Sequence, residues 1–384
     1  MKMKYYFDYN ATTPVDPRVV EEMTPFFSEI FHNPSSFYRL AGEARYRIEQ
    51  CRVKVAEMIN GRADEIYFTS GGTESDTMAI MGVANKGNHI ITSSIEHPAV
   101  LQTCKYLEKK GYRISYLPVD HNGLVDPGEL KKNITSETIL VSIMHANNEI
   151  GTIQPIKELV EIAHQNGVLF HTDAVQSAGK ILLDVKDLDI DLLSLSSHKI
   201  YGPKGVGVLF KKGSVDIEPL IFGGDHEKGL RAGTENVPGI VGLGKAAELV
   251  VAEREIEEKR LRPLRDRLQR ELMERIPEIL INGGQEPRLY NTLNISIRFI
   301  EGESILALLD QDQIAMSSGS ACSSKSPDPS HVLLAIGMSH EDAHGSLRIS
   351  LGKFNTDDDI DVLIDILPRV AEKLRKISPF WPVR

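Results

Sequence analysis

The sequence has few cysteines: Cys51, Cys104 and Cys322 are the only three in 384 residues. An odd and low number argues against a disulfide framework and is typical of proteins in a reducing compartment. The motif CxxC is absent as well, so a structural zinc site is not expected. Any function of a cysteine must therefore be inferred from the residues around it.

Long apolar runs and basic blocks are also missing. Residues 139–144 form one of the longest apolar runs and are already interrupted by Ser142, whereas a membrane-spanning helix needs about 20 apolar residues. The N-terminus lacks the apolar core of a signal peptide, so we expect a cytoplasmic protein with no membrane association. The net charge of −10, without a compensating Lys/Arg block, disfavours direct binding to nucleic acid.

What the sequence does contain is the composition of a globular enzyme, with 41% hydrophobic and 26% charged residues. Short apolar runs alternate with helical patterns between residues 50 and 210, which predicts an α/β fold with a doubly wound, mostly parallel sheet. In such a sheet the ligand lies beyond the carboxyl ends of the strands. We expect strands at residues 66–69, 89–93, 113–119, 139–144, 168–173, 192–196 and 206–210.

The C-terminal third has a different pattern. A helix is expected from about residue 244 into the 270s, kinked by Pro263, followed by short mixed strands and helices up to residue 377. This predicts a second, smaller α+β domain. We therefore expect a large domain at residues 15–256 and a small domain formed by residues 1–14 and 257–384, with the N-terminal segment extended across the C-terminal part.

Two predicted strands end at, or shortly before, an ionisable residue. Asp173 ends one strand, where its carboxylate either caps a following helix or keeps a ring nitrogen protonated. Lys199 follows the next strand and enters a loop of Gly and Pro, where it is either an exposed loop residue or a nucleophilic amine suited to a Schiff base. The spacing of 26 positions leaves room for both side chains to reach one crevice.

Other strand ends carry residues suited to an anion. Gly72 and Thr73 open a helical pattern, where backbone N–H groups form either an ordinary turn or a phosphate cradle. Ser196 and His198, which flank Ser197 just before Lys199, can donate hydrogen bonds to the same phosphate.

Two more strand ends carry residues suited to a flat ring and its substituents. His97 is either a structural histidine or a ring that stacks on a ligand and moves protons near neutral pH. Asn147 and Asn148 either form a turn or hold ring oxygens or a substrate carboxylate. Jointly, these strand ends describe one site whose parts match pyridoxal 5'-phosphate.

At this point the sequence resembles the cysteine desulfurases of the NifS/IscS-like group, in the class V pyridoxal-phosphate-dependent aminotransferase superfamily. The resemblance implies fold type I, with a seven-stranded, mostly parallel sheet, and conversion of L-cysteine to L-alanine with pyridoxal phosphate. The matching segments span nearly the whole chain in the family's order: 7–14, 33–36, 69–75, 96–97, 145–151, 171–176, 196–205, 223–233, 317–324 and 348–352.

The resemblance also implies roles for single residues. Lys199 resembles the Schiff-base lysine, Asp173 the partner of the ring nitrogen, and Gln176 the donor to the phenolic oxygen of the ring. His97 resembles the histidine that stacks on the ring and assists proton transfer. Gly72, Thr73, Ser196 and His198 resemble the residues that bind the cofactor phosphate, and Thr234 resembles a residue that binds the phosphate in the other subunit of a homodimer. Asn148 and Arg348 resemble the residues that bind the substrate carboxylate. Asn148 is also implied to contact the cofactor.

Cys322 lies among small residues, Ser320-Ala321 before it and Ser323-Ser324 after it, a setting that leaves a thiol accessible. Cys51 and Cys104 lie in helical patterns instead. The resemblance implies that Cys322, in a mobile loop at about 317–329, becomes a persulfide and passes sulfur to an iron–sulfur scaffold protein, with thio-cofactors or tRNA thiolation as further destinations. It also raises Cys322 as a shared ligand of the nascent iron–sulfur cluster.

Three other functions fit the same scaffold: a selenocysteine lyase, an aminotransferase and a sulfur carrier without catalysis. Transamination needs no accessible cysteine, so the Ser-Ala-Cys-Ser loop argues against it. A carrier would not need Lys199, Asp173, His97 and Arg348 together. The use of selenocysteine stays open at the level of the sequence.

Overall fold

The computed structural model describes residues 4–284, 287–318 and 328–382. Its large sheet has seven strands in the order β2-β8-β7-β6-β5-β3-β4. Every strand predicted in this part of the chain is present, with ends shifted by at most two residues. The bounds are β2 (Ile66–Thr69), β3 (His89–Ser93), β4 (Arg113–Leu117), β5 (Thr138–Ser142), β6 (Leu169–Asp173), β7 (Leu192–Ser196) and β8 (Gly207–Lys211).

The seven-stranded sheet is mostly parallel, as predicted, and one strand is the exception. β8 runs antiparallel to both of its neighbours, β7 and β2. The connection between β7 and β8 spans only residues 197–206. A parallel crossover needs about a dozen or more residues, usually with a helix, so this short connection reverses the direction of β8. The other strands all run in one direction, so β2, β3, β5, β6 and β7 end at the same edge of the sheet.

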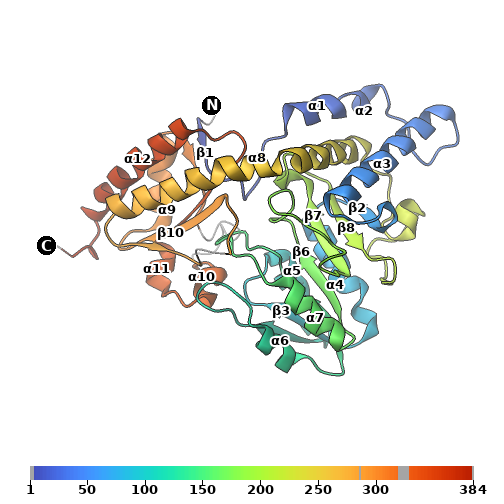
Figure 1. Cartoon of the computed structure of the whole chain (residues 1–384), viewed down its shortest axis with the longest axis horizontal. Helices are drawn as coiled ribbons and strands as arrows, with labels where there is room; N and C mark the ends of the chain where they lie inside the picture. Colours follow the sequence, from blue (N-terminus) through green and yellow to red (C-terminus); the bar gives the residue numbers. More distant parts are fainter. Residues whose placement is uncertain (1–3, 285–286, 319–327, 383–384) are drawn as a thin grey trace.

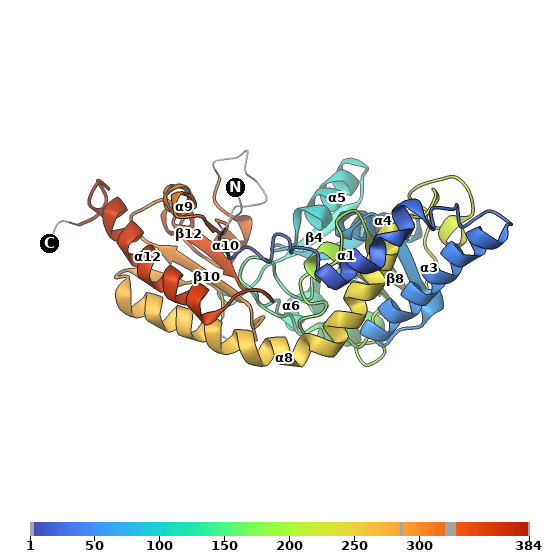
Figure 2. The same cartoon turned by 90° about the horizontal axis from the view of Figure 1, so that it is seen from above.

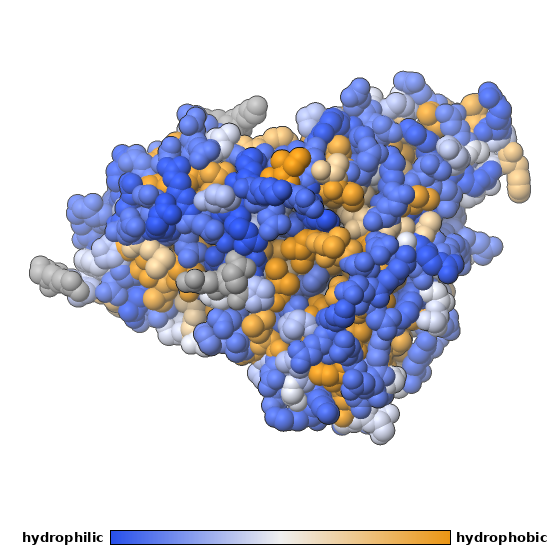
Figure 3. All heavy atoms as spheres, viewed as in Figure 1, coloured by the Kyte–Doolittle hydropathy of each residue, from blue (hydrophilic) through white to orange (hydrophobic). Residues whose placement is uncertain are grey.

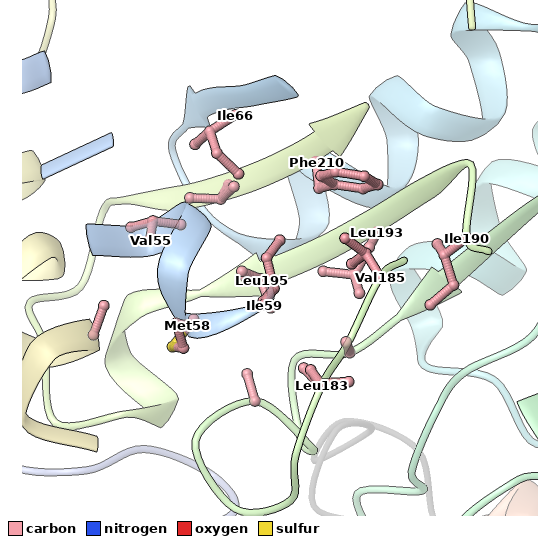
Figure 4. Close-up of a cluster of buried hydrophobic side chains, with 14 of the residues drawn as sticks. Val55, Met58, Ile59, Ile66, Leu183, Val185, Ile190, Leu193, Leu195 and Phe210 are labelled. Atoms are coloured by element: carbon pink, nitrogen blue, oxygen red, sulfur yellow. The ribbon is translucent and has the colours of Figure 1, made fainter. Parts of the chain in front are cut away.

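Alternating side chains of the strands build two apolar layers, one on each face of the sheet. Ile66 and Phe68 lie in one layer and Tyr67 in the other. The first layer packs against α3 (Arg39–Met58), α6 (Pro127–Asn133), α7 (Ile156–Gln165) and the first half of α8 (Val237–Arg275), and Figure 4 shows part of it. The second layer packs against α4 (Gly72–Gly82) and α5 (Pro98–Lys109).

The C-terminal part forms a second body with its own core (Figures 1 and 2). An antiparallel sheet has the order β12-β10-β9, and a short parallel pair joins β1 to β11. Phe7 belongs to this second core, as expected for an N-terminal segment that crosses to the C-terminal part. The bounds are β1 (Tyr5–Tyr6), β9 (Ile279–Ile281), β10 (Thr292–Ile297), β11 (Ile314–Ala315), β12 (Ser346–Ser350), α9 (Gly302–Gln311), α10 (His331–Ala335), α11 (His340–His344) and α12 (Asp357–Arg375).

α8 connects the two bodies, as Figure 2 shows. Residues up to Val250 belong to the first core and residues from Leu261 to the second. The helix begins at Val237, earlier than the sequence pattern predicted, because the Asn236 side chain caps it by accepting a hydrogen bond from Gly239 N. It continues through Pro263 as one helix. The two cores lie on either side of the predicted domain division, whose residue boundaries stay a prediction.

Candidate active site

A cavity of about 270 Å³ lies at the edge of the sheet where β2, β3, β5, β6 and β7 end. Of the described residues to which the resemblance gives a role, all but Thr234 line it. Its lining is Asn10, Ala11, Gly72, Thr73, Asp76, His97, Met144, Asn148, Asp173, Val175, Gln176, Ser196, His198, Lys199 and Arg348. Parallel strands bring these residues together from distant parts of the sequence, as expected for an α/β sheet.

Lys199 ends a short 3-10 turn directly after β7. Its ammonium group donates hydrogen bonds to two backbone carbonyls, Asn10 O at 2.6 Å and Ala11 O at 2.7 Å. The N-terminal segment therefore crosses the cavity and holds the lysine in it. Thr13 fixes this crossing, because its backbone N–H and its hydroxyl both donate to His198 O.

The loop after Lys199 is held in a strained conformation. Tyr201 has φ of +64°, a left-handed backbone that a bulky aromatic residue rarely adopts. Hydrogen bonds on both sides compensate this strain: Tyr201 N donates to Thr13 Oγ1 at 2.9 Å, and the Tyr201 hydroxyl accepts from Lys353 N at 2.7 Å. Strain of this kind persists only where the surroundings impose it, and it often marks a functional site.

Asp173 is buried at the end of β6. Its Oδ1 accepts a hydrogen bond from Val175 N at 2.8 Å. Burial raises the pKa of this carboxyl to about 6, while the Val175 N–H and the nearby Lys199 act in the opposite direction. The group is thus mostly ionised at neutral pH and is suited to holding a protonated ring nitrogen. The carboxylate therefore stabilises the turn after β6 and lines the cavity at the same time.

His97 caps the N-terminus of α5, with Nδ1 accepting a hydrogen bond from Ala99 N at 3.1 Å. Burial, together with the nearby Lys199 and His331, lowers its pKa to about 4. The imidazole is therefore neutral at pH 7. Since Nδ1 accepts, the proton lies on Nε2.

An anion cradle is formed where α4 begins. Gly72 is the first residue of this helix, whose N-terminal N–H groups favour a negative charge. A Cβ atom at Gly72 would lie 2.8 Å from Val175 Cγ2, so the close approach requires glycine. Thr73 and Ser196 add hydroxyls at the cavity. His198 is neutral, because burial lowers its pKa to about 4.

Arg348 lines the cavity from β12 of the small sheet. Its guanidinium donates to Asp8 Oδ1 at 2.8 Å and to Asn148 O at 3.2 Å. Within the described residues its buried Nε has no hydrogen-bond partner, and neither has the buried Oε1 of Gln176. Buried polar atoms without a partner are rare, so this cavity is suited to a polar ligand. The ionised Asp173, the glycine cradle and Lys199 are the groups that pyridoxal phosphate needs.

Five residues that line the cavity were not recognised in the sequence: Asn10, Ala11, Asp76, Met144 and Val175. Asn10 and Ala11 act through backbone carbonyls, for which a sequence carries no signal. Asp76 lies one helical turn after Thr73 on α4, so its position could have been inferred from the spacing. Burial raises the pKa of Asp76 well above its usual range, and the charge of Asp173 adds to this.

Thr234 does not line the cavity and is exposed. Cys322 lies outside the described residues. The buried thiols of Cys51 and Cys104 are poor nucleophiles, because burial raises their pKa to about 11 and about 12. Neither Cys51 nor Cys104 is therefore suited to act as a nucleophile.

Two negative findings concern the described part of the chain. It contains no helix with the length and apolar character needed to cross a membrane. It also contains no cluster of three or more His, Cys, Asp or Glu side chains that could bind a metal ion.

Comparisons with known proteins agree with this chemistry. The family model described as aminotransferase class-V matches residues 5–363. The cysteine desulfurase IscS of Dictyoglomus turgidum is 53% identical over 384 residues, which cover 99% of this chain and 98% of the relative. A solved NifS-like protein is 42% identical with a TM-score of 0.92, covering 97% of this chain and 100% of the other. A structure described as SspA in complex with cysteine is 38% identical with a TM-score of 0.82, covering 92% and 100%.

Proposed function

This chain belongs to the class-V aminotransferase family and is a pyridoxal-phosphate-dependent cysteine desulfurase, and on that premise we propose a role for each side chain around the cavity. The reaction converts L-cysteine to L-alanine and leaves the sulfur on the enzyme. The observation that carries the proposal is the convergence of Lys199, Asp173 and Arg348 on one cavity beside a glycine cradle.

Pyridoxal phosphate, when bound, supplies an electron sink that stabilises the negative charge left after the substrate Cα loses its proton. The N-terminus of α4, Thr73, Ser196 and His198 bind its phosphate. Asp173 keeps its ring nitrogen protonated. Gln176 holds its phenolic oxygen.

The other side chains act on the substrate. Arg348 and Asn148 bind the carboxylate of cysteine, for which a guanidinium fork is suited. Lys199 would hold the cofactor covalently, and its free amine would remove the proton from the substrate Cα. His97 would stack on the ring and offer the proton of Nε2 to the reacting atoms.

Cys322 completes the reaction as the sulfur acceptor. Its thiolate attacks the substrate sulfur, so that a sulfur–sulfur bond forms while the carbon–sulfur bond breaks, and the electron pair left on Cβ takes up a proton. The products are a persulfide on Cys322 and, after release, alanine.

An aminotransferase would instead release a keto acid and keep no sulfur. Incubation of the purified protein with cysteine should yield alanine and, with a reductant, sulfide in equal amounts; pyruvate without sulfide would contradict the proposal.

Asp173→Asn tests the role of the ring-nitrogen partner. A neutral amide cannot hold the ring proton, so the variant should keep the cofactor bound but remove the Cα proton at least about a hundredfold more slowly, a typical loss when an acid–base group is removed. Stopped-flow absorbance after mixing with cysteine gives this rate. A rate equal to that of the wild type would contradict the role.

The homodimer is proposed from exposed aromatic surface and from Thr234. Large apolar side chains gather around α1 (Pro17–Met23), α2 (Pro25–Ser28) and the start of α3, and orange and pale orange surface lies over this part of the molecule (Figure 3). Exposed aromatic patches of this kind mark interaction sites. The aromatic residues are Phe27, Phe31, Phe37, Tyr38 and Tyr46, with Phe222 from the segment before Thr234.

Thr234 supplies the functional test of this dimer. Thr234→Val should weaken cofactor binding by about tenfold or more, because a hydrogen bond to a charged group contributes about 1.5–3 kcal/mol. A mixture of Thr234→Val and Lys199→Ala chains should regain activity, since one site of each mixed dimer then has both intact residues. No recovery after subunit exchange, or full activity of a chain that sediments as a monomer, would contradict a shared site.

The destination of the sulfur is proposed as an iron–sulfur scaffold protein in the cytoplasm. The cysteine content, typical of a reducing compartment, supports this location. Transfer of labelled sulfur from the persulfide to a purified scaffold protein, measured with and without reductant, tests the acceptor.

A further inference from the structure

Residues 319–327, which include Cys322, lie outside the described part of the chain, but the described residues on either side of them contact residues beside the proposed substrate-carboxylate site. On one side Ser317 pairs with Arg348, with Arg348 N donating to Ser317 O at 2.7 Å and Ser317 N donating to Arg348 O at 3.4 Å. On the other side the Ser330 hydroxyl donates to Glu149 Oε2, and Glu149 directly follows Asn148. The first attachment uses backbone atoms, whereas the second depends on two side chains.

Ser330 has two roles at once. It is buried, and its oxygen accepts hydrogen bonds from Val332 N at 3.1 Å and Leu333 N at 3.3 Å, which caps α10. The hydrogen of the same hydroxyl points to Glu149. The cap therefore orients the hydroxyl, and a residue without a hydroxyl would lose both contacts.

Glu149 is rigidly held and poorly solvated. Its backbone N–H donates to Asn147 Oδ1 at 2.8 Å, and its carbonyl accepts from Asn294 Nδ2 at 3.1 Å. The side chain is buried, and burial raises its pKa to about 7, against the effects of Ser330 and Arg348. Burying a carboxyl group costs free energy, so this residue is unlike the exposed acids of the surface.

α10 is docked on the large domain next to this pair. Val332 and Leu333 pack against Ile95, Met144 and Ile150, which come from the ends of the large sheet. His331 Nε2 donates to Glu96 O at 3.0 Å. The helix after the Cys322 segment thus has a fixed place, and the bond between Glu149 and Ser330 sets where the segment enters it.

We propose that Glu149 and Ser330 are positioning residues for Cys322: their buried hydrogen bond fixes the end of the thiol-bearing segment at the substrate site. The inference rests on the proposed role of Cys322 as sulfur acceptor. A hydrogen bond from a hydroxyl to a carboxylate is short and strong when it is buried. Neither residue lines the cofactor cavity, so loss of the bond should lower the rate of persulfide formation on Cys322 while cofactor binding is kept.

Ser330→Ala is the main test. Binding of cofactor and of cysteine, followed by absorbance, and the KM should stay near the wild-type values. The rate of persulfide formation on Cys322 in a single turnover should fall by about tenfold to a hundredfold, the range expected when a reacting group is slightly misplaced. Ser330→Thr keeps the hydroxyl and should restore the rate.

A matched control separates this effect from the loss of a helix cap. Ser339 caps the next helix, α11, by accepting from Asp342 N at 3.1 Å, and it is exposed. Ser339→Ala should therefore leave the persulfide rate unchanged. Ser330→Asp keeps a capping oxygen but places a second carboxylate against Glu149, so its rate should fall at least as far as that of Ser330→Ala.

A double-mutant cycle tests whether the two residues act through one bond. Glu149→Met removes the acceptor of the Ser330 hydroxyl and leaves the cap of α10 in place, and it replaces Ser330→Ala as the main test if the alanine variant does not fold. The double variant should be no slower than the slower single variant. Additive losses, or a wild-type persulfide rate in either folded and cofactor-loaded single variant, would overturn the inference. If the wild type itself forms no persulfide on Cys322, the proposed function fails instead.

Discussion

Lys199→Ala should lose all measurable turnover and the visible absorbance of the covalently bound cofactor. The reason is that Lys199 is the lysine that lines the cavity together with Asp173, so both the covalent link and the base for the Cα proton disappear at once. Removal of a group with two such roles is expected to cost more than about 10⁴-fold in kcat. Absorbance spectra and alanine formation measure the two losses separately.

Lys180 is the control for this prediction. It is buried, and burial lowers its pKa to about 7, so it is the other lysine of this region with the character of a nucleophile. Its Nζ donates to Gln176 O at 2.8 Å, and it does not line the cofactor cavity. Lys180→Met should keep the covalently bound cofactor. A borohydride-trapped cofactor on Lys180 rather than Lys199 would contradict the assignment of Lys199 as the Schiff-base lysine.

Cys322→Ser should bind cofactor and cysteine but release no sulfur. Lys199, His97 and Arg348 are unchanged in this variant, so the substrate complex should form at its normal rate. A hydroxyl is a far weaker nucleophile than a thiolate at neutral pH, and the release of alanine should fall by at least about 10³-fold. Absorbance shows that the complex forms, and quantitative amino-acid analysis shows that it does not proceed.

Variants of the two buried cysteines separate this effect from a general loss of thiols. Cys104→Ala and Cys51→Ala should retain turnover near that of the wild type. They should lose about 1 kcal/mol or more of stability, because each side chain packs in an apolar layer. A desulfurase that depends on Cys104 would show the opposite ranking of the three variants.

The site was predictable from the sequence where position along a strand determines it. Asp173 and Ser196 are the last residues of β6 and β7, and parallel strands necessarily bring such ends together. The reversed direction of β8 was not predicted, because it follows from a short connection and not from any residue pattern. The same limit applies to the carbonyls of Asn10 and Ala11, which hold Lys199 through backbone atoms that every residue has.

Contacts between the two domains were the least predictable part. Arg348 was assigned to the substrate carboxylate, but its hydrogen bond to Asn148 O at 3.2 Å joins the two predicted domains. Glu149 and Ser330 are likewise far apart in the sequence, and neither belongs to a periodic pattern. Such pairs depend on the packing of one domain on the other, which local propensity does not encode.

The central claim is that sulfur leaves cysteine and is held by Cys322. Mass spectrometry of peptides after brief treatment of the wild-type enzyme with L-cysteine tests it most directly. One additional sulfur atom should map to the peptide that contains Cys322, disappear with dithiothreitol, and be absent from Cys322→Ser. An adduct on Cys51 or Cys104, or alanine formation without any sulfur on Cys322, would contradict the account.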